Sequence, residues 1–335
     1  FIAQLNNYGE LAYLALSLTM LLKKHRGVKD LSKVAAIAKV MQHPLLRNEK
    51  QALSFRAQSL YYYIWSAYLV ATRQFEKSEY YLTAQIELYN RHRHFLQAAP
   101  GNYLGALSDL LVSRFRTRQY DEVLRLIGQL KKLPDSNEIK RVTSKRFRMV
   151  IFSWTFKVEV GVAIQTGTVR AQLHPIQEQE VFFHRYSAVM EPRRRLETML
   201  ALAAFYFHLP DHKRSAQLIE KLLSDDASAL NHEINAVARV LQIVIHYDDG
   251  SFDVLDYLVS GLKRFVAKQK DATKMEKQLV EFANKLEHLH RKKNQPDFFA
   301  LQLKKFSELK KDRFEKHNFD YFDITEWLKK KMERQ

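Results

Sequence analysis

Residues 73–77 read Arg-Gln-Phe-Glu-Lys, and residues 118–122 read Arg-Gln-Tyr-Asp-Glu. Each pentapeptide follows a run of aromatic and aliphatic residues. It opens another run in which apolar residues recur every three or four positions, as on one face of a helix. The aromatic residues Phe75 and Tyr120 are 45 positions apart. Because periods of roughly 20 to 50 residues are typical of repeat architectures, this pair of junctions decides the predicted fold.

Comparable helix-to-helix junctions follow elsewhere in the chain at a similar spacing. They fall at residues 27–28, 167–169, 210–212, 250–253 and 296–298. His212 and Phe252, for example, are 40 positions apart. The junctions define about seven helical hairpins, and since one hairpin buries too little apolar surface to be stable alone, we expect the hairpins to stack on one another.

Composition excludes several other classes of protein. The chain of 335 residues is 46% hydrophobic and 12% aromatic, which supplies a large buried core and argues against disorder. Only 9 Gly and 7 Pro are present, although a β-sheet fold needs these residues at its turns. The absence of Cys excludes disulfides, thiolate zinc sites, iron–sulfur clusters and cysteine nucleophiles, and it fits a reducing compartment.

Proline and the apolar pattern together divide the chain into helices. Most of the seven prolines lie between stretches of helical periodicity, and Tyr120, Val123 and Ile127 lie on one apolar stripe. We expect helices over residues 3–25, 29–42, 52–72, 75–94, 103–117, 120–132, 137–165, 169–190, 194–208, 212–224, 231–247, 252–269, 272–292, 297–316 and 323–333.

Three of these hairpins resemble the tetratricopeptide repeat (TPR) family. That family places small residues where the two helices of a hairpin cross and an aromatic residue at the start of the second helix. Ser66, Phe75 and Ser78 match this layout, and the hairpins that end at Pro134 and span 196–223 match it more loosely. A TPR unit has about 34 residues, whereas the unit here averages in the mid-forties, so a HEAT-like or irregular all-α solenoid is the alternative.

The resemblance implies a right-handed, all-α solenoid of about seven antiparallel helical hairpins. Its concave face, lined by the first helix of each hairpin, would bind a peptide or protein without catalysis. We expect one helical-repeat domain over residues 1–318. The aromatic segment 319–335 is expected to cap the end of the solenoid, with Asp323 and Thr325 at the start of its helix. The alternative is that this segment is a docking peptide for a partner.

Aromatic and basic residues of the first helices are the candidate partner-binding residues. With the groove geometry of the TPR family, the concave side would include Tyr63, Arg116, His208 and Tyr247. Mixed aromatic and basic groups suit an acidic or aromatic peptide. The alternative for these positions, and for Trp65 beside Tyr63, is packing between hairpins.

The basic character of the chain raises a second class of partner. Its net charge is +17 and its pI is near 9.7. Arg193, Arg194 and Arg195 open a helix, where positive charge opposes the helix dipole, so we add them to the candidate partner-binding residues. Nucleic-acid binding, to RNA in particular, is the alternative function. It would use basic hairpins around residues 140–148 (Lys140, Arg141, Lys145, Arg146 and Arg148), 193–195 and 291–316.

The sequence contains no motif for catalysis, a cofactor or a metal. Among its 13 His residues, His208 and His212 are four apart, but Pro210 interrupts the helix between them. Gly-rich phosphate loops, Gly-x-Ser-x-Gly, His-Glu-x-x-His and the dinucleotide fingerprint are missing. We therefore expect no catalytic residues, no metal site and no cofactor. The alternative is a hydrolase with a dispersed site, which would need a deep pocket where carboxylates or His converge.

The longest apolar run gives no sign of membrane insertion. Residues 11–22 are too few to cross a bilayer, and they lack the small-residue cleavage pattern of a secretory signal. We expect a cytoplasmic protein without a membrane span. Because the chain begins at Phe1 rather than at Met, the sequence does not decide whether a signal or a further domain precedes that residue.

Overall fold

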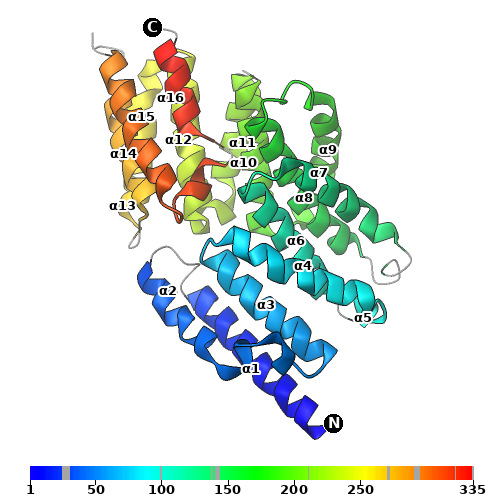
Figure 1. Cartoon of the computed structure of the whole chain (residues 1–335). Coiled ribbons are helices and arrows are strands. Elements are labelled where there is room, and N and C mark those ends of the chain that lie inside the picture. Colours follow the sequence, from blue (N-terminus) through cyan, green and yellow to red (C-terminus); the bar gives the residue numbers. More distant parts are fainter. Residues whose placement is uncertain are drawn as a thin grey trace. The chain divides into compact units, whose positions relative to one another are not determined.

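The computed structural model of the chain (Figure 1) describes residues 1–24, 31–98, 100–136, 139, 144–209, 211–269, 272–289, 295–320 and 322–333. Over these residues the chain forms α-helices and short 3₁₀ helices, with no strand. The protein is therefore all-α, as its low Gly and Pro content predicts. The chain divides into two compact units, residues 1–158 and residues 159–335.

The first unit consists of helices that pack against their neighbours in chain order. Its α-helices are α1 (Ile2–Lys24), α2 (Leu31–Ala38), α3 (Phe55–Ala71), α4 (Phe75–Arg91), α5 (His94–Ala98), α6 (Pro100–Arg116), α7 (Tyr120–Lys132) and the start of α8 (Lys145–Gln165). Three 3₁₀ turns, η1 (Val40–Gln42), η2 (Pro44–Leu46) and η3 (Glu49–Gln51), connect α2 to α3. Helix α3 packs on α1 and α4, and α6 packs on α4 and α7.

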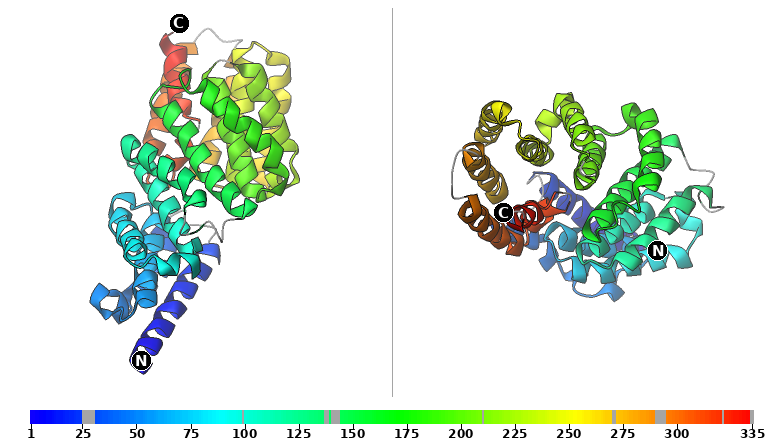
Figure 2. Two further views of the ribbon diagram at one scale, coloured as in Figure 1. Left: turned by 90° about the vertical axis from the view of Figure 1, so that its right-hand side faces the viewer. Right: turned by 90° about the horizontal axis from the view of Figure 1, so that it is seen from above.

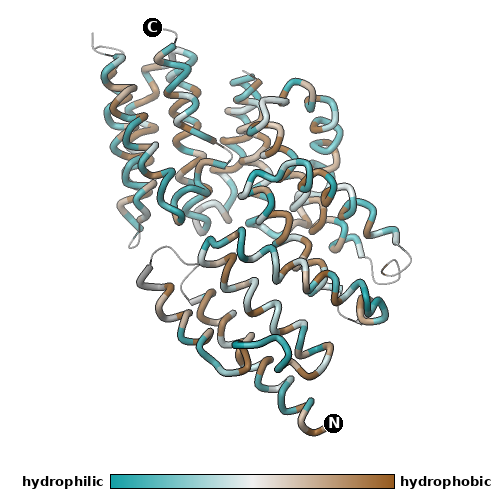
Figure 3. The backbone as a smooth tube through the Cα atoms, in the orientation of Figure 1, coloured by the Kyte–Doolittle hydropathy of each residue, from teal (hydrophilic) through white to brown (hydrophobic). Residues whose placement is uncertain are grey.

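The second unit follows the same rule. Its α-helices after α8 are α9 (Leu173–Tyr186), α10 (Pro192–His208), α11 (His212–Ser224), α12 (His232–Asp248), α13 (Leu255–Ala267), α14 (Lys274–Glu287), α15 (Gln295–Lys311) and α16 (Ile324–Glu333). Each helix from α11 to α16 packs on the helix before it, and α12 also packs on α10 and α14. Hydrophobic residues gather on the sides where consecutive helices face one another (Figure 3).

Most expected helices are present, and the differences lie at their ends. The helix expected over 29–42 ends at Ala38 and continues as 3₁₀ turns, because Pro44 holds His43 extended (φ −60°, ψ 136°). The helix expected over 169–190 begins only at Leu173. The expected junction at 27–28, Pro210, Lys140 and Arg141 lie outside the described residues. No described helix combines the length and the apolar character needed to cross a membrane.

The two repeated pentapeptides form the same turn. The N–H of Gln74 donates to the carbonyl of Leu69 (2.8 Å), and the N–H of Arg73 donates to Val70 (3.1 Å). These two bonds define a Schellman motif, in which one residue adopts a left-handed conformation after the helix ends. That residue is Arg73 (φ 60°) in the first junction and Arg118 (φ 63°) in the second.

Two glycine junctions use the same backbone geometry. Gly167 (φ 71°) and Gly250 (φ 73°) occupy the left-handed position, which glycine adopts without steric cost. The following residues, Thr168 and Ser251, donate their N–H groups back to carbonyls five residues earlier, each at 2.9 Å. Four of the junctions expected from sequence therefore share one C-terminal helix cap.

A pair of side-chain bonds makes the first two junctions still more alike. The amide of Gln74 donates to the hydroxyl of Thr72 at 2.9 Å, and the amide of Gln119 donates to Thr117 at the same distance. The structural repeat is therefore Thr-Arg-Gln-aromatic. It begins at Thr72 and Thr117, one residue before the two pentapeptides.

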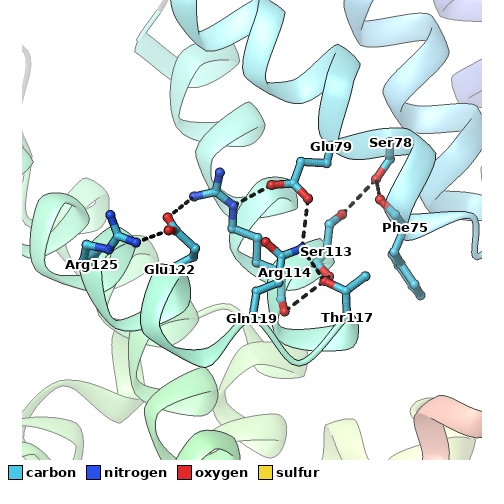
Figure 4. Close-up of polar contacts among 9 residues, drawn as sticks. All are labelled: Phe75, Ser78, Glu79, Ser113, Arg114, Thr117, Gln119, Glu122 and Arg125. Carbon is cyan, nitrogen blue, oxygen red and sulfur yellow. Dashed lines mark hydrogen bonds and ion pairs between the residues drawn. The ribbon is translucent and has the colours of Figure 1, made fainter.

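Small and polar side chains join α4 to α6 and α7 (Figure 4). The hydroxyls of Ser78 and Ser113 are 3.0 Å apart and buried, so the two helices approach closely there. Arg114 contacts Glu79 at 2.9 Å and Glu122 at 3.3 Å. Burial by itself would raise the pKa of Glu79, but hydrogen bonds from Gln119 and Arg114 hold it below its usual value.

A buried carboxylate performs a similar role in the second unit. Glu180 of α9 is buried and accepts hydrogen bonds from the Tyr206 hydroxyl of α10 (2.5 Å) and from the guanidinium of Arg214 of α11 (2.8 Å). The Arg214 guanidinium also lies 4.3 Å from the centroid of the Tyr206 ring. Because a buried carboxylate without partners is strongly destabilising, this network fixes how the three helices meet.

The shared left-handed cap predicts opposite effects for the same substitution at two glycines. Gly250→Ala should lower the free energy of unfolding by about 1 kcal/mol, because an L-residue is strained at positive φ. Gly128→Ala, inside α7, should raise it by about 0.5–1 kcal/mol, because Ala is the better helix former. Neither added Cβ meets an atom within 4 Å, so backbone conformation alone sets the sign.

The same reasoning applies in reverse to Arg118, which is exposed. Arg118→Gly should raise the free energy of unfolding by about 0.5–1 kcal/mol by removing left-handed strain. Urea unfolding followed by circular dichroism measures all three variants. A destabilised Arg118→Gly chain would show that its side chain, rather than its backbone, matters at this junction.

Candidate functional site

The C-terminal segment 322–333 lies against several helices of the second unit. Seen from above, those helices follow an arc, and α16 lies on its inner side (Figure 2, right). Helix α16 packs along α15, and Phe322, just before it, meets Phe207 of α10 edge to face with ring centroids 5.6 Å apart. Four apolar residues of the segment are buried: Phe322, Ile324, Trp327 and Leu328.

Trp327 is the central contact of this segment. Its ring meets three others, each edge to face: Tyr247 of α12 at 6.0 Å, Phe282 of α14 at 6.0 Å and Phe299 of α15 at 5.9 Å. This edge-to-face geometry is the favourable one for aromatic pairs and adds to the energy of burial. Trp327 therefore fills an aromatic seat to which α12, α14 and α15 each contribute one ring.

The polar edge of Trp327 is recognised as well. Its indole N–H donates to both carboxylate oxygens of Asp248, at 2.9 and 3.2 Å. Lys331, one turn later on α16, contacts the same carboxylate at 2.6 Å and lies 5.5 Å from the centroids of both the Tyr247 and Trp327 rings. Asp248 and Lys331 are mostly buried, so their attraction is less screened than that of a surface pair. We call Tyr247, Asp248, Phe282 and Phe299 the tryptophan seat.

The start of α16 is fixed by local chemistry. The carboxylate of Asp323 accepts hydrogen bonds from the N–H (3.0 Å) and hydroxyl (2.6 Å) of Thr325, as expected for a helix cap. Lys310 of α15 forms an ion pair with Asp323 and donates to the hydroxyl of Thr325. The cap and the ion pair together place α16 on α15.

A cavity of about 180 Å³ lies between α16 and the C-terminal ends of α10 and α12. His208 lines it, and its Nε2 atom has no hydrogen-bond partner among the described residues. Burial, aided by the positive charge of Lys330, lowers the pKa of His208 to about 4. His212, also on the wall, forms a 2.5 Å contact with Asp249.

The cavity also brings together Asp248, Asp323 and Glu326. This is the convergence of acids and His that a hydrolase would need, but the carboxylates already have partners. Asp248 is paired with Lys331, Asp323 with Lys310, and Glu326 with Lys329. Among the described residues, no group of three or more His, Asp or Glu is placed to hold a metal ion. The cavity therefore presents ion-paired carboxylates, aromatic rings, the ammonium groups of Lys330 and Lys331, and the imidazole of His208.

Two of the residues predicted to bind a partner lie at this site. Tyr247 belongs to the tryptophan seat, and His208 lines the adjoining cavity. Tyr63 and Arg116 lie in the first unit, on α3 and at the end of α6. The Tyr63 hydroxyl is 3.1 Å from that of Thr19, and Arg116 is half-buried.

The predicted arginine triplet lies elsewhere in the second unit. Arg193, Arg194 and Arg195 are in the first turn of α10, whereas His208 is its last residue, about 20 Å away along the helix. Glu191 accepts the N–H groups of Arg193 and Arg194, and this acidic cap offsets the unfavourable charge at the helix start. Arg193 pairs with Glu197, and Arg195 makes a two-pronged contact with Asp225.

The sequence did not identify Asp248 or Lys331 as site residues. Asp248 comes just before the helix junction at 250–253, and nothing in the sequence links it to Trp327, which follows 79 residues later. The usable signal was the concentration of aromatic residues after 319. Comparisons of the chain with models of protein families, with curated proteins and with solved structures found no match.

The pKa of His208 predicts a pH dependence of stability. Because this pKa is about 4 in the folded protein and about 6.5 in an unfolded chain, the folded state binds fewer protons between these values. The free energy of unfolding should therefore fall as the pH drops from 6.5 to 4, by up to about 1.4 kcal/mol per pH unit. Lys330 strengthens this effect, whereas Asp323 and Glu326 oppose it.

Urea unfolding at pH 7, 6 and 5 measures this dependence. His208→Leu should flatten the pH profile, while substitution of the exposed His174 by Asn should leave it unchanged. If the His208→Leu variant lost stability with falling pH as steeply as the wild-type chain does, the pH dependence would belong to another group.

Proposed function

We propose that this protein is a non-catalytic, TPR-like helical scaffold that binds a polypeptide on the inner face of its second unit. The observation that supports this function is the seat of Trp327. The face to which α12 and α14 contribute already holds an amphipathic helix, through one aromatic anchor and one basic side chain. Recognition of an amphipathic helix by its apolar face is a common mode of polypeptide binding.

A right-handed solenoid is the arrangement that we propose for the helices. Its support is the packing of consecutive helices in chain order and the recurrence of one left-handed cap at 73, 118, 167 and 250. A stack of this kind keeps its binding surface rigid, so little conformational entropy is lost when a partner binds. A HEAT-like or irregular solenoid would provide the same rigidity.

The chemistry of the seat refines the expected partner. Tyr247, Phe282 and Phe299 favour an aromatic anchor, in agreement with the aromatic peptide expected from sequence. Asp248 favours a base one helical turn after that anchor. We therefore propose a partner helix with an aromatic residue and a Lys or Arg four positions later. An acidic partner would have to bind outside the seat.

Ion pairing favours a polypeptide over a nucleic acid. Several residues of the basic hairpins already contact acids: Arg193 with Glu197, Arg195 with Asp225, Lys305 with Glu281, and Lys310 with Asp323. A phosphate backbone would have to compete with these carboxylates for each cation.

Helix α16 and a partner helix would compete for the tryptophan seat. Because α16 is tethered to α15, its effective concentration at the seat is of the order of millimolar or higher, and a free ligand must overcome it. Weakening α16 without removing the seat should therefore unmask binding.

The test uses a fluorescent peptide with the sequence of residues 322–333. A full-length Trp327→Ala chain should bind this peptide at least about tenfold more tightly than the wild-type chain, because the internal competitor is weakened. The same peptide carrying the Trp327→Ala change should bind neither chain. Fluorescence anisotropy measures the three affinities. Tyr257→Ala, at an exposed tyrosine of α13, is the matched control and should behave as wild type.

Limited proteolysis of the segment 319–333 reports whether α16 is released in the Trp327→Ala chain. Release without peptide binding would show that the segment is only a structural cap. A salt titration with random RNA and duplex DNA tests the alternative function. Tight binding with a steep log–log dependence on salt would favour a nucleic acid over the polypeptide proposed here.

A further inference from the structure

A second concave surface lies in the first unit, among α3, α4 and the turn that follows α2. It has a volume of about 650 Å³, and its lining includes the aromatic side chains of Trp65, Tyr68, Tyr80 and Tyr81. We call it the aromatic groove and define it by the residues Met41, Trp65, Tyr68, Lys77, Tyr80 and Tyr81. The function proposed above makes no use of this groove.

The rings of the groove form one continuous series. Trp65 and Tyr81 stack, with centroids 5.2 Å apart and planes inclined by 12°. Tyr80 meets Tyr81 edge to face at 5.1 Å, and Tyr68 meets Trp65 edge to face at 6.3 Å. The Trp65 indole N–H also donates to the carbonyl of Leu46 at 3.1 Å. Rings held in this way keep their orientation before a ligand arrives, which reduces the entropy lost on binding.

The polar side chains that line the groove are the phenols of Tyr68, Tyr80 and Tyr81, the amides of Gln42 and Gln74, and the ammonium of Lys77. Among the described residues, the hydroxyls of Tyr68 and Tyr81 and the ammonium of Lys77 make no hydrogen bond, so these donors are open to a ligand. No carboxylate lines the groove. The nearby Glu49 already accepts the hydroxyls of Tyr62 (3.3 Å) and Tyr80 (3.4 Å). A ligand in this groove would therefore meet aromatic faces and unused donors.

We propose that the aromatic groove binds a proline-rich segment in the polyproline II conformation, with an acidic residue beside Lys77. A polyproline II chain has no internal hydrogen bonds, so its carbonyls are free to accept from Tyr68 and Tyr81. Proline lacks an N–H group, so each proline of such a segment needs no acceptor from the groove. Aromatic-lined grooves recognise such segments because the ligand is already ordered before binding.

A helix matches this surface poorly, which separates the groove from the tryptophan seat. Most carbonyls of a helix are already bonded within the helix, so they cannot satisfy the free phenols. The proposal rests on the first unit alone and does not depend on the function proposed for the second. Failure of one would leave the other standing.

In the test, the full-length chain is titrated with acetylated decaproline that carries two Asp residues at its C-terminus. Binding is measured by isothermal titration calorimetry. We expect saturable binding. Tyr80→Ala removes a rim ring that is 60% exposed and should weaken binding about tenfold. The double variant Tyr68→Phe with Tyr81→Phe keeps both rings and removes only the donors, and it should also weaken binding about tenfold. Tyr13→Ala, at a tyrosine of α1 that is 71% exposed, is the matched control and should bind as wild type.

Two comparison peptides and the circular dichroism of each variant complete the test. A Gly-Ser peptide of equal length and charge should not bind. The affinity of the peptide 322–333 should be the same for the Tyr80→Ala chain as for the wild-type chain. The proposal is wrong if decaproline fails to bind at millimolar concentration. It is also wrong if the groove variants, with unchanged spectra, bind as wild type does, or if the Gly-Ser peptide binds equally well.

Discussion

The interior of each unit depends on helices that must be covered on more than one side. In α10, every residue from Thr198 to Tyr206 is buried, and α12 is buried almost as completely. Such helices cannot be stable as one hairpin in water, because their apolar surface exceeds what a single partner covers. Their neighbours before and after in the chain supply the remaining cover, as the packing of α12 on α10, α11, α13 and α14 illustrates. The last helix of such a series would be left with an open face, and in the second unit α16 lies over that region.

The backbone geometry between helices follows from the same need. Two helices can pack side by side only if the chain reverses within a few residues, and the left-handed cap achieves this at Arg73, Arg118, Gly167 and Gly250. Two of the four positions carry arginine in a conformation that favours glycine. At both positions a threonine and a glutamine flank the arginine and bond to each other, so side-chain contacts support a turn that the backbone alone disfavours. The polar contacts of Glu79 with Arg114 and Gln119 then hold the next helix in place.

Periodicity and junction residues were sufficient to predict the helices, because both depend on interactions within about five residues. The boundaries at Ala71, Phe75 and Tyr120 follow directly from the repeated pentapeptides. The tryptophan seat could not be predicted in the same way, since Asp248 and Trp327 meet only after α13, α14 and α15, which lie between them in the chain, have packed. The arginine triplet shows the converse limit. Its charges suggested a binding surface, but Glu197 on the same helix pairs with Arg193, and Asp225, which follows α11 thirty residues later, pairs with Arg195.

The two concave surfaces differ in what they leave unsatisfied, and this difference decides which backbone each can accept. The tryptophan seat offers rings and one carboxylate, so it selects side chains: an aromatic edge with an N–H, and a cation one turn later. The backbone of its occupant satisfies itself, which is why a helix suits it. The aromatic groove offers rings and free donors, so it suits a backbone whose carbonyls are not hydrogen-bonded within the ligand itself. A helical protein that carried both surfaces would distinguish a helical partner segment from an extended one by the hydrogen-bonding groups that each segment leaves free.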